Sequence, residues 1–236
     1  RQPRDEQVDH PVADEPDPAE QVDRRVGGIG PAFGHAPPRL IAVTKYVSGE
    51  ETLPLQALGV TDIGENRVQV LREKLPVVSG KFFLHLIGRL QNNKVKYIIK
   101  DVCLIHSVDN LSLAQEIDRQ AGKNGLRMDV LLQVNVTGES QKGGVPPEEL
   151  MPLLRQVAPL PGVHVRGLMT MMPLGAERDY IFERFRATRQ LLERCREEAV
   201  AGTDMTELSM GMSQDYDLAA RAGATMVRVG SALWRA

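Results

Sequence analysis

The 236-residue sequence has no uninterrupted apolar run of the ~20 residues that cross a membrane. It also lacks an excess of charge of one sign, because 29 Lys and Arg against 31 Asp and Glu leave a formal net charge of −2. No overall field therefore favours nucleic acid or an anionic membrane as a partner. No basic segment followed by an apolar one opens the chain, so we predict a cytoplasmic protein that binds neither nucleic acid nor membrane.

Cysteine is scarce as well. Cys103 lies in an apolar run and Cys195 in a charged, helix-like run. Their spacing matches no Cys-x-x-Cys or Cys/His ligand pattern, so no metal site is predicted. Disulfides are rare in the cytosol, and we therefore expect both thiols to be reduced.

The first 38 residues differ in composition from the rest. They hold seven of the 15 prolines and acidic stretches such as DEPDPAE, a composition that buries little apolar surface. Only Val22, Val26 and Ile29 hint at a short amphipathic helix. We expect residues 1–38 to be poorly ordered or translated out of frame, and the coding DNA tests the second idea.

From Arg39 onward, short β-like runs alternate with helix-like segments. The predicted strands are residues 40–44, 61–64, 82–88, 102–108, 129–136, 163–170, 206–211 and 225–230. The predicted helices are residues 50–58, 66–74, 92–100, 111–122, 147–158, 177–200 and 215–222. Eight such units predict an α/β fold, a single (β/α)8 TIM-type barrel over residues 39–236. A doubly wound sheet is the alternative, but the first turn, TKYVSGEE, has no Gly-x-Gly-x-x-Gly for a dinucleotide.

Barrel enzymes carry their chemistry at the carboxyl ends of the strands. Lys45 follows the first predicted strand, where it is either a solvated strand end or a desolvated amine able to condense with an aldehyde. Lys94 and Lys142 are rival lysines in polar surroundings. By itself, the position of Lys45 favours a solvated strand end, and the settings of Lys94 and Lys142 favour solvated or anion-facing lysines.

An anion site is predicted in the loops after strands seven and eight, SMGMSQD and RVGSALW. Gly211 and Gly230 allow close backbone approach, and Ser213 and Ser231 supply hydroxyls, although each serine alone is also an ordinary helix cap. Arg228 interrupts an apolar strand, so its guanidinium needs either an anionic ligand or an internal carboxylate. A phosphate site opposite a reactive lysine suggests pyridoxal phosphate, which carries a phosphate and an aldehyde on one rigid ring.

The order of six motifs resembles that of the pyridoxal phosphate homeostasis proteins. These motifs span residues 39–234: IAVTK, IGENRVQ, HLIGRLQNNK, QVNVTGESQKGG, VRGLMTM and LSMGMSQDYDLAARAGATMVRVGSALW. The resemblance implies a barrel like the N-terminal domain of alanine racemase, of pyridoxal phosphate fold type III. It also implies that the C-terminal β-domain of that racemase is missing.

The resemblance also implies residue roles. Lys45 is expected to form the internal aldimine with the cofactor, and Arg228 to face its pyridine nitrogen and keep that nitrogen unprotonated. The expected phosphate ligands are Ser213, Gly230 and Ser231, with Ser209 and Gly211 shaping their loop. Asn66, His85 and Met169 are expected to line the pocket, although His85 could equally be a hydrogen-bonded core histidine.

The leading functional prediction is a monomeric carrier of pyridoxal phosphate that buffers the cofactor or delivers it to apoenzymes. Dedicated catalysis is not expected, because no second base or substrate domain is evident. A pyridoxal phosphate-dependent amino-acid racemase with one base is the alternative. A cofactor-free aldolase that uses Lys45 is the third possibility.

Overall fold

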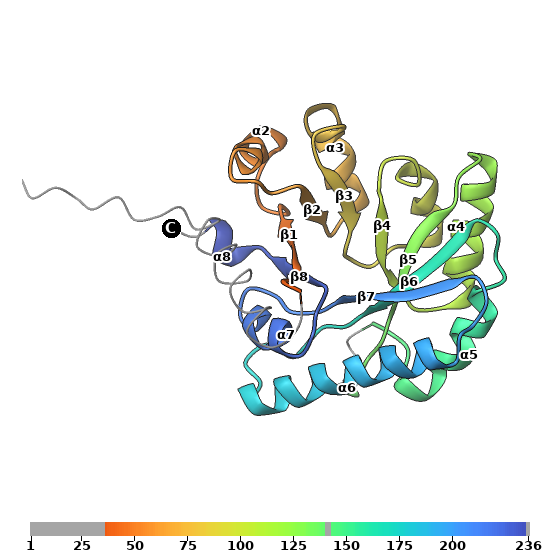
Figure 1. Ribbon diagram of the computed structural model, residues 1–236. Helices are drawn as coiled ribbons and strands as arrows, with labels where there is room; N and C mark the ends of the chain where they lie inside the picture. The colour runs from red at the N-terminus through yellow and green to blue at the C-terminus, as the bar shows by residue number, and fades with distance from the viewer. Residues whose placement is uncertain (1–35, 140–142, 235–236) are drawn as a thin grey trace, which may run out of the picture.

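The protein forms a closed barrel of eight parallel strands in a computed structural model that describes residues 36–139 and 143–234 (Figure 1). The strands neighbour one another in chain order, and β8 pairs with β1 to close the ring. They are β1 (Arg39–Val43), β2 (Asp62–Glu65), β3 (Phe83–Leu86), β4 (Leu104–Val108), β5 (Met128–Gln133), β6 (Val163–Met169), β7 (Thr203–Ser209) and β8 (Met226–Val229). All eight predicted strands are present, and the predicted barrel is confirmed.

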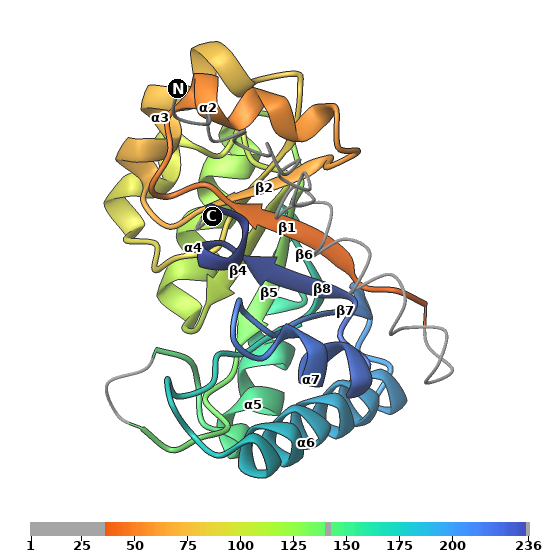
Figure 2. The same cartoon turned by 90° about the vertical axis from the view of Figure 1, so that its left-hand side faces the viewer.

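Helices connect the strands and surround the barrel. The α-helices are α2 (Gly49–Thr52), α3 (Val68–Val78), α4 (Leu111–Lys123), α5 (Pro147–Val157), α6 (Arg178–Glu197), α7 (Tyr216–Arg221) and α8 (Ser231–Trp234). Figure 2 shows α2 and α3 on one side of the strands and α5, α6 and α7 on the other. In the described part of the chain, no helix is both long and apolar enough to cross a bilayer.

Two predicted helices were wrong in type. The segment predicted at 50–58 is a single α-turn followed by the 3-10 helix η1 (Leu53–Gln56), with Pro54 at its start. The segment predicted at 92–100 is the 3-10 helix η2 (Asn92–Tyr97). Val95 is the buried residue of this 3-10 helix, and Ile98, which caps its end, is buried as well. The predicted helix around Val22 lies outside the described residues.

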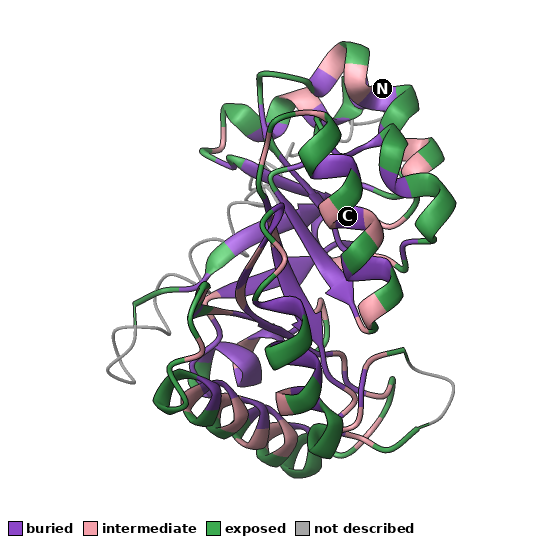
Figure 3. Cartoon of the chain, turned by 90° about the vertical axis from the view of Figure 1, so that its right-hand side faces the viewer, coloured by how far each residue is buried: buried purple, intermediate pink, exposed green. Residues whose placement is uncertain are grey.

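The main hydrophobic core fills the layer between strands and helices. Figure 3 shows buried strands inside and helices whose outward faces are exposed. Leu40 and Ala42 of β1 belong to this layer, as do Phe185 and Leu192 of α6. Because successive strand side chains point to opposite faces, Ile41 between them points into the barrel.

The interior of the barrel is a second, smaller cluster. Its apolar members are Ile41, Leu104, Leu131, Met169 and Met226. Buried polar side chains share the inward face of the strands: His85, His106, Ser209 and Arg228. A barrel interior with this much buried polarity requires a hydrogen-bond partner for each group.

Candidate functional site

A cavity of 610 Å³ lies where the carboxyl ends of the strands meet. Its walls include residues that follow each of the eight strands, with Gly143 contributing from the loop after β5 and Gln133 closing that strand. This volume is within the ~300–1,000 Å³ usual for small-molecule sites. Six of the ten predicted site residues line it: Lys45, Asn66, Ser213, Arg228, Gly230 and Ser231.

Lys45 lies two residues beyond the end of β1 and is exposed at the cavity. Its Nζ is 4.7 Å from the centre of the Tyr46 ring. No hydrogen bond or ion pair holds this amine within the described residues. The amine is therefore free to meet a ligand in the cavity.

The backbone next to Lys45 is firmly held. The Thr44 hydroxyl donates to Oε1 of Glu65 at 2.5 Å, and the ammonium of Lys74 donates to the Thr44 carbonyl at 2.5 Å. The same ammonium also pairs with Glu65, and all three side chains are buried. On the other side, the Trp234 indole donates to the Val43 carbonyl at 2.8 Å. The end of β1 thus presents an exposed lysine side chain on an anchored backbone.

Arg228 brings a buried positive charge to the cavity wall. Its Nη1 donates to Ser209 Oγ at 2.5 Å and its Nη2 to the Thr170 carbonyl at 2.9 Å. Burial lowers the pKa of Arg228 to about 10, against the opposing effect of Asp215, so the guanidinium stays charged at neutral pH. No carboxylate forms an ion pair with it in the described segments. Of the two partners that the sequence left open for Arg228, an internal carboxylate is therefore not in direct contact with the guanidinium among the described residues.

Hydroxyl and backbone donors gather at the ends of β7 and β8. Ser213 Oγ accepts from the backbone N–H of Gly230 at 3.1 Å and of Ala232 at 3.3 Å. Ser231 follows β8 at the start of α8. The N–H groups of Gly230 and Ala232 orient the Ser213 hydroxyl, and the hydroxyls of Ser213 and Ser231 can donate to the oxygens of an anion.

A buried carboxylate lies beside these donors. Oδ1 of Asp215 accepts from the Met212 N–H at 2.6 Å, which orders the loop before α7. Burial raises the pKa of Asp215, although the Met212 hydrogen bond and Arg228 act in the opposite direction.

Gly211 is required for packing and backbone conformation, not for close approach to an anion. It does not line the cavity, and its φ is +92°. A Cβ there would lie 2.5 Å from Cβ of Ala219 and 3.0 Å from Cα of Tyr216. Gly211 is thus required by the packing of this loop on α7.

Three further predicted residues do not reach the cavity. Ser209 is fully buried behind Arg228, and Met169 packs inside the barrel with Leu131. His85 bonds to Asp62 and His106 and lines a different cavity, at the amino ends of the strands. The structure thus places His85 as the hydrogen-bonded core histidine that the sequence left as an alternative.

The rival lysines lie elsewhere. Lys94 lines a separate surface groove beside Tyr97, while Lys142 falls outside the described residues. Both cysteines are free thiols. In the described ranges, no group of His, Cys, Asp and Glu could hold a metal ion.

Several cavity residues were not predicted from the sequence. They are Tyr46, Arg89, Asp109, Gln133, Met171, Pro173 and Leu174. Asp109 directly follows β4, so the rule that selected Lys45 could have selected it as well. Leu174 lies farther along its loop and is 80% exposed, which no strand-end rule would indicate.

The chain is similar in sequence to known proteins over most of its length. The family model described as "Alanine racemase, N-terminal domain" matches residues 33–236. The pyridoxal phosphate homeostasis protein of Aquifex aeolicus is 41% identical over 197 residues, 83% of this chain and 86% of that protein. Its counterpart from Deinococcus radiodurans is 43% identical over 197 residues, 83% and 88% of the two chains.

A solved structure extends the comparison to three dimensions. PipY of Synechococcus elongatus PCC7942, solved with PLP bound, has a TM-score of 0.79 and 34% identity. The match covers 91% of this chain and 100% of PipY.

Proposed function

Because the chain belongs to the family of pyridoxal phosphate homeostasis proteins, with the barrel of the alanine racemase N-terminal domain, we propose that it binds pyridoxal 5'-phosphate in the cavity at Lys45. One observation carries the proposal. A free lysine amine, a buried guanidinium and a group of hydroxyl and N–H donors line a single cavity of 610 Å³. PLP bound to PipY, which matches along its whole length, supports the same cofactor.

The cofactor, when bound, supplies an aldehyde that an amine can attack, a ring nitrogen and a phosphate. The residues present fit these three parts. Lys45 supplies the amine, Arg228 a fixed positive charge, and Ser213 with Gly230 and Ser231 the hydrogen-bond donors. Asn66 contributes a further polar group to the wall.

Lys45 is proposed as the point of covalent attachment. Its neutral form is the nucleophile, and the long side chain can reach into the cavity while Thr44 holds the backbone still. Exchange of the cofactor with another amine needs this same side chain to be accessible, and Lys45 is exposed.

Arg228 is proposed to face the ring nitrogen. A guanidinium donates a hydrogen bond and repels a second positive charge, so it opposes protonation of that nitrogen. An unprotonated ring is a weaker electron sink than a protonated one.

The physiological role we propose is cytoplasmic homeostasis of pyridoxal phosphate, with a monomer that buffers the cofactor and passes it to apoenzymes. The relatives from A. aeolicus and D. radiodurans bear homeostasis in their names, which supports the role. Light scattering should give the monomer mass of 26.1 kDa.

Cofactor titration followed by borohydride reduction and peptide mapping tests the proposal. A new visible absorption band should saturate at one equivalent, and the reduced adduct should map to Lys45. Lys45→Ala should abolish both signals. Lys94→Ala is the matched control, because Lys94 lies in the separate groove, and it should retain them.

Two outcomes would contradict the proposal. An adduct on another lysine would displace Lys45, and a colourless protein without affinity for the cofactor would favour the cofactor-free aldolase. Incubation of the loaded protein with L-alanine separates the remaining alternative, since accumulation of D-alanine would indicate a racemase.

A further inference from the structure

A chain of buried side chains crosses the barrel from Arg228 to its opposite end. Arg228 Nη1 donates to Ser209 Oγ at 2.5 Å, and Ser209 Oγ lies 2.9 Å from Nδ1 of His106. Nε2 of His106 is 3.0 Å from Nδ1 of His85, whose Nε2 is 2.8 Å from Oδ1 of Asp62. Every one of these side chains is at most 3% exposed.

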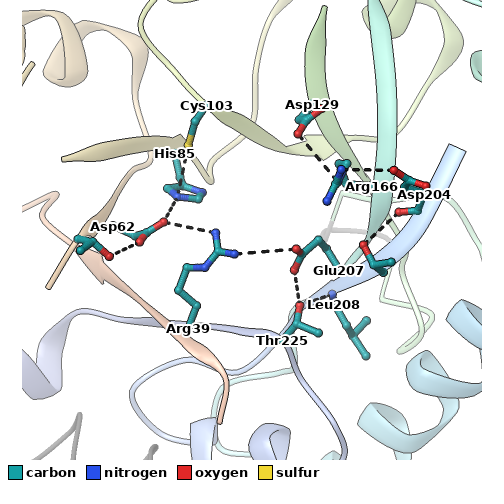
Figure 4. Close-up of polar contacts among 12 residues, drawn as sticks. Arg39, Asp62, His85, Cys103, Asp129, Arg166, Asp204, Glu207, Leu208 and Thr225 are labelled. Carbon is teal, nitrogen blue, oxygen red and sulfur yellow. Dashed lines mark hydrogen bonds and ion pairs between the residues drawn. The ribbon is translucent and has the colours of Figure 1, made fainter. Parts of the chain in front are cut away.

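The Asp62 end of this chain of side chains lies at the amino ends of the strands. Figure 4 shows His85 pointing at Asp62, which also lies beside Arg39. Burial would raise the pKa of Asp62, but hydrogen bonds from His85 and Thr61, with the charge of Arg39, together lower it. Asp62 is therefore an ionised acceptor at neutral pH.

Arg228 and Asp62, at the two ends, determine which group donates in each hydrogen bond between them. A guanidinium can only donate and a carboxylate can only accept. Ser209 Oγ accepts from Arg228, so its own hydrogen is directed to Nδ1 of His106, 2.9 Å away. Burial first, and then His85 and Arg228, hold the pKa of His106 well below its ordinary value, so this ring is neutral.

The histidine tautomers follow from that order. With Nδ1 of His106 accepting, its single proton sits on Nε2 and is donated to Nδ1 of His85. His85 then carries its proton on Nε2 and donates it to Asp62. The chain runs Arg228 to Ser209 to His106 to His85 to Asp62, with each group donating to the next.

We propose that this directed chain positions Arg228 at the cofactor cavity and links its charge to Asp62 at the far end of the barrel. His106 and His85 are positioning residues, and they touch neither the cavity nor its ligand. Asp215 lies near Arg228, but its Oδ1 accepts from Met212, and among the described residues the two form no ion pair. The part of this proposal that concerns the ligand rests on the proposed function, whereas the tautomers belong to the protein alone.

Nitrogen-15 NMR of the histidine side chains tests the direction in protein without cofactor. Both His85 and His106 should show a protonated Nε2 and a bare Nδ1. A protonated Nδ1 on His106 would overturn the proposal, whatever the protein binds. Wild-type protein suffices for this measurement, so no variant has to fold.

Asp62→Asn tests the link to the cavity. The amide can turn either its oxygen or its nitrogen toward His85, so the bias on both tautomers is lost and a protonated Nδ1 should appear on His106. Affinity for pyridoxal phosphate should fall about 5-fold or more, the lower range of coupling between distant sites. The visible band of the bound cofactor should shift as well.

Asp129→Asn is the matched control. Asp129 lines the same cavity as Asp62, at the amino ends of the strands. It pairs with His164 at 2.8 Å and, among the described residues, does not contact the hydrogen-bonded side chains that run from Arg228 to Asp62. It should leave tautomers, affinity and band unchanged. Equal effects of the two substitutions, or none from Asp62→Asn, would refute the link. A wild-type protein that does not bind pyridoxal phosphate would refute the proposed function instead, and the NMR result would stand.

Discussion

Lys74→Met should be among the most damaging single substitutions outside the cavity. Lys74 is 5% exposed, and its ammonium donates to the Thr44 carbonyl and pairs with Glu65, which is 1% exposed. Its loss leaves the Glu65 carboxylate buried with one remaining donor, the Thr44 hydroxyl, since Oε2 of Glu65 already has no partner. Breaking a buried ion pair from one side costs ~3–5 kcal/mol.

The loss is measurable in two ways. For a chain of this size, the expected cost lowers the midpoint of thermal unfolding by roughly 6–20 °C. Denaturant unfolding gives the free energy directly. Because Thr44 precedes Lys45, a looser strand end should also weaken attachment of pyridoxal phosphate, read from the same titration as for wild type.

Two further variants make the reasoning refutable. Lys81→Met removes an exposed lysine whose side chain forms no hydrogen bond or ion pair within the described residues, and it should change stability by less than ~0.5 kcal/mol. The double variant Lys74→Met with Glu65→Leu removes both charges and should recover most of the loss. A cost below ~1 kcal/mol for Lys74→Met, or no recovery in the double variant, would mean that this ion pair does not hold the end of β1.

Two other predictions concern packing and thiol chemistry. Gly211→Ala should cost ~2–4 kcal/mol in denaturant unfolding, because backbone strain at φ +92° is added to an overlap with Ala219. Gly59→Ala should cost only ~1–2 kcal/mol, because its φ is also positive, at +80°, but nothing lies within 4 Å of the added Cβ. Equal losses of stability in the two variants would mean that the overlap with Ala219 is absent. Burial raises the pKa of the Cys195 thiol to about 11, so alkylation at pH 8 should be ~100-fold or more slower in the native than in the unfolded protein. The same shift removes stability as pH rises from about 9 to about 11, because the unfolded thiol ionises first. Rapid native labelling of Cys195, mapped by peptide analysis, would contradict its burial.

The sequence alone determined the architecture and the principal chemistry. Alternation of short apolar runs with amphipathic segments is a local property, and eight repeats of it leave few folds besides a barrel. Lys45 and Gly230 could be placed at the cavity for the same reason, since the end of a parallel strand in a barrel is always at the same rim. Arg228 could be singled out because a charge in an apolar strand is visible without any structure.

Only the tertiary structure decided which polar residues face the cofactor cavity and which support it from behind. His85 and Ser209 lie in the same kinds of strand as Arg228, but the direction and depth of each side chain depend on strand register and tilt. The anchor of Thr44, Glu65 and Lys74 joins residues up to 30 positions apart, and no local pattern encodes such a pair. The chain from Arg228 to Asp62 exists for the same reason, because five inward side chains from five strands meet only when the barrel closes.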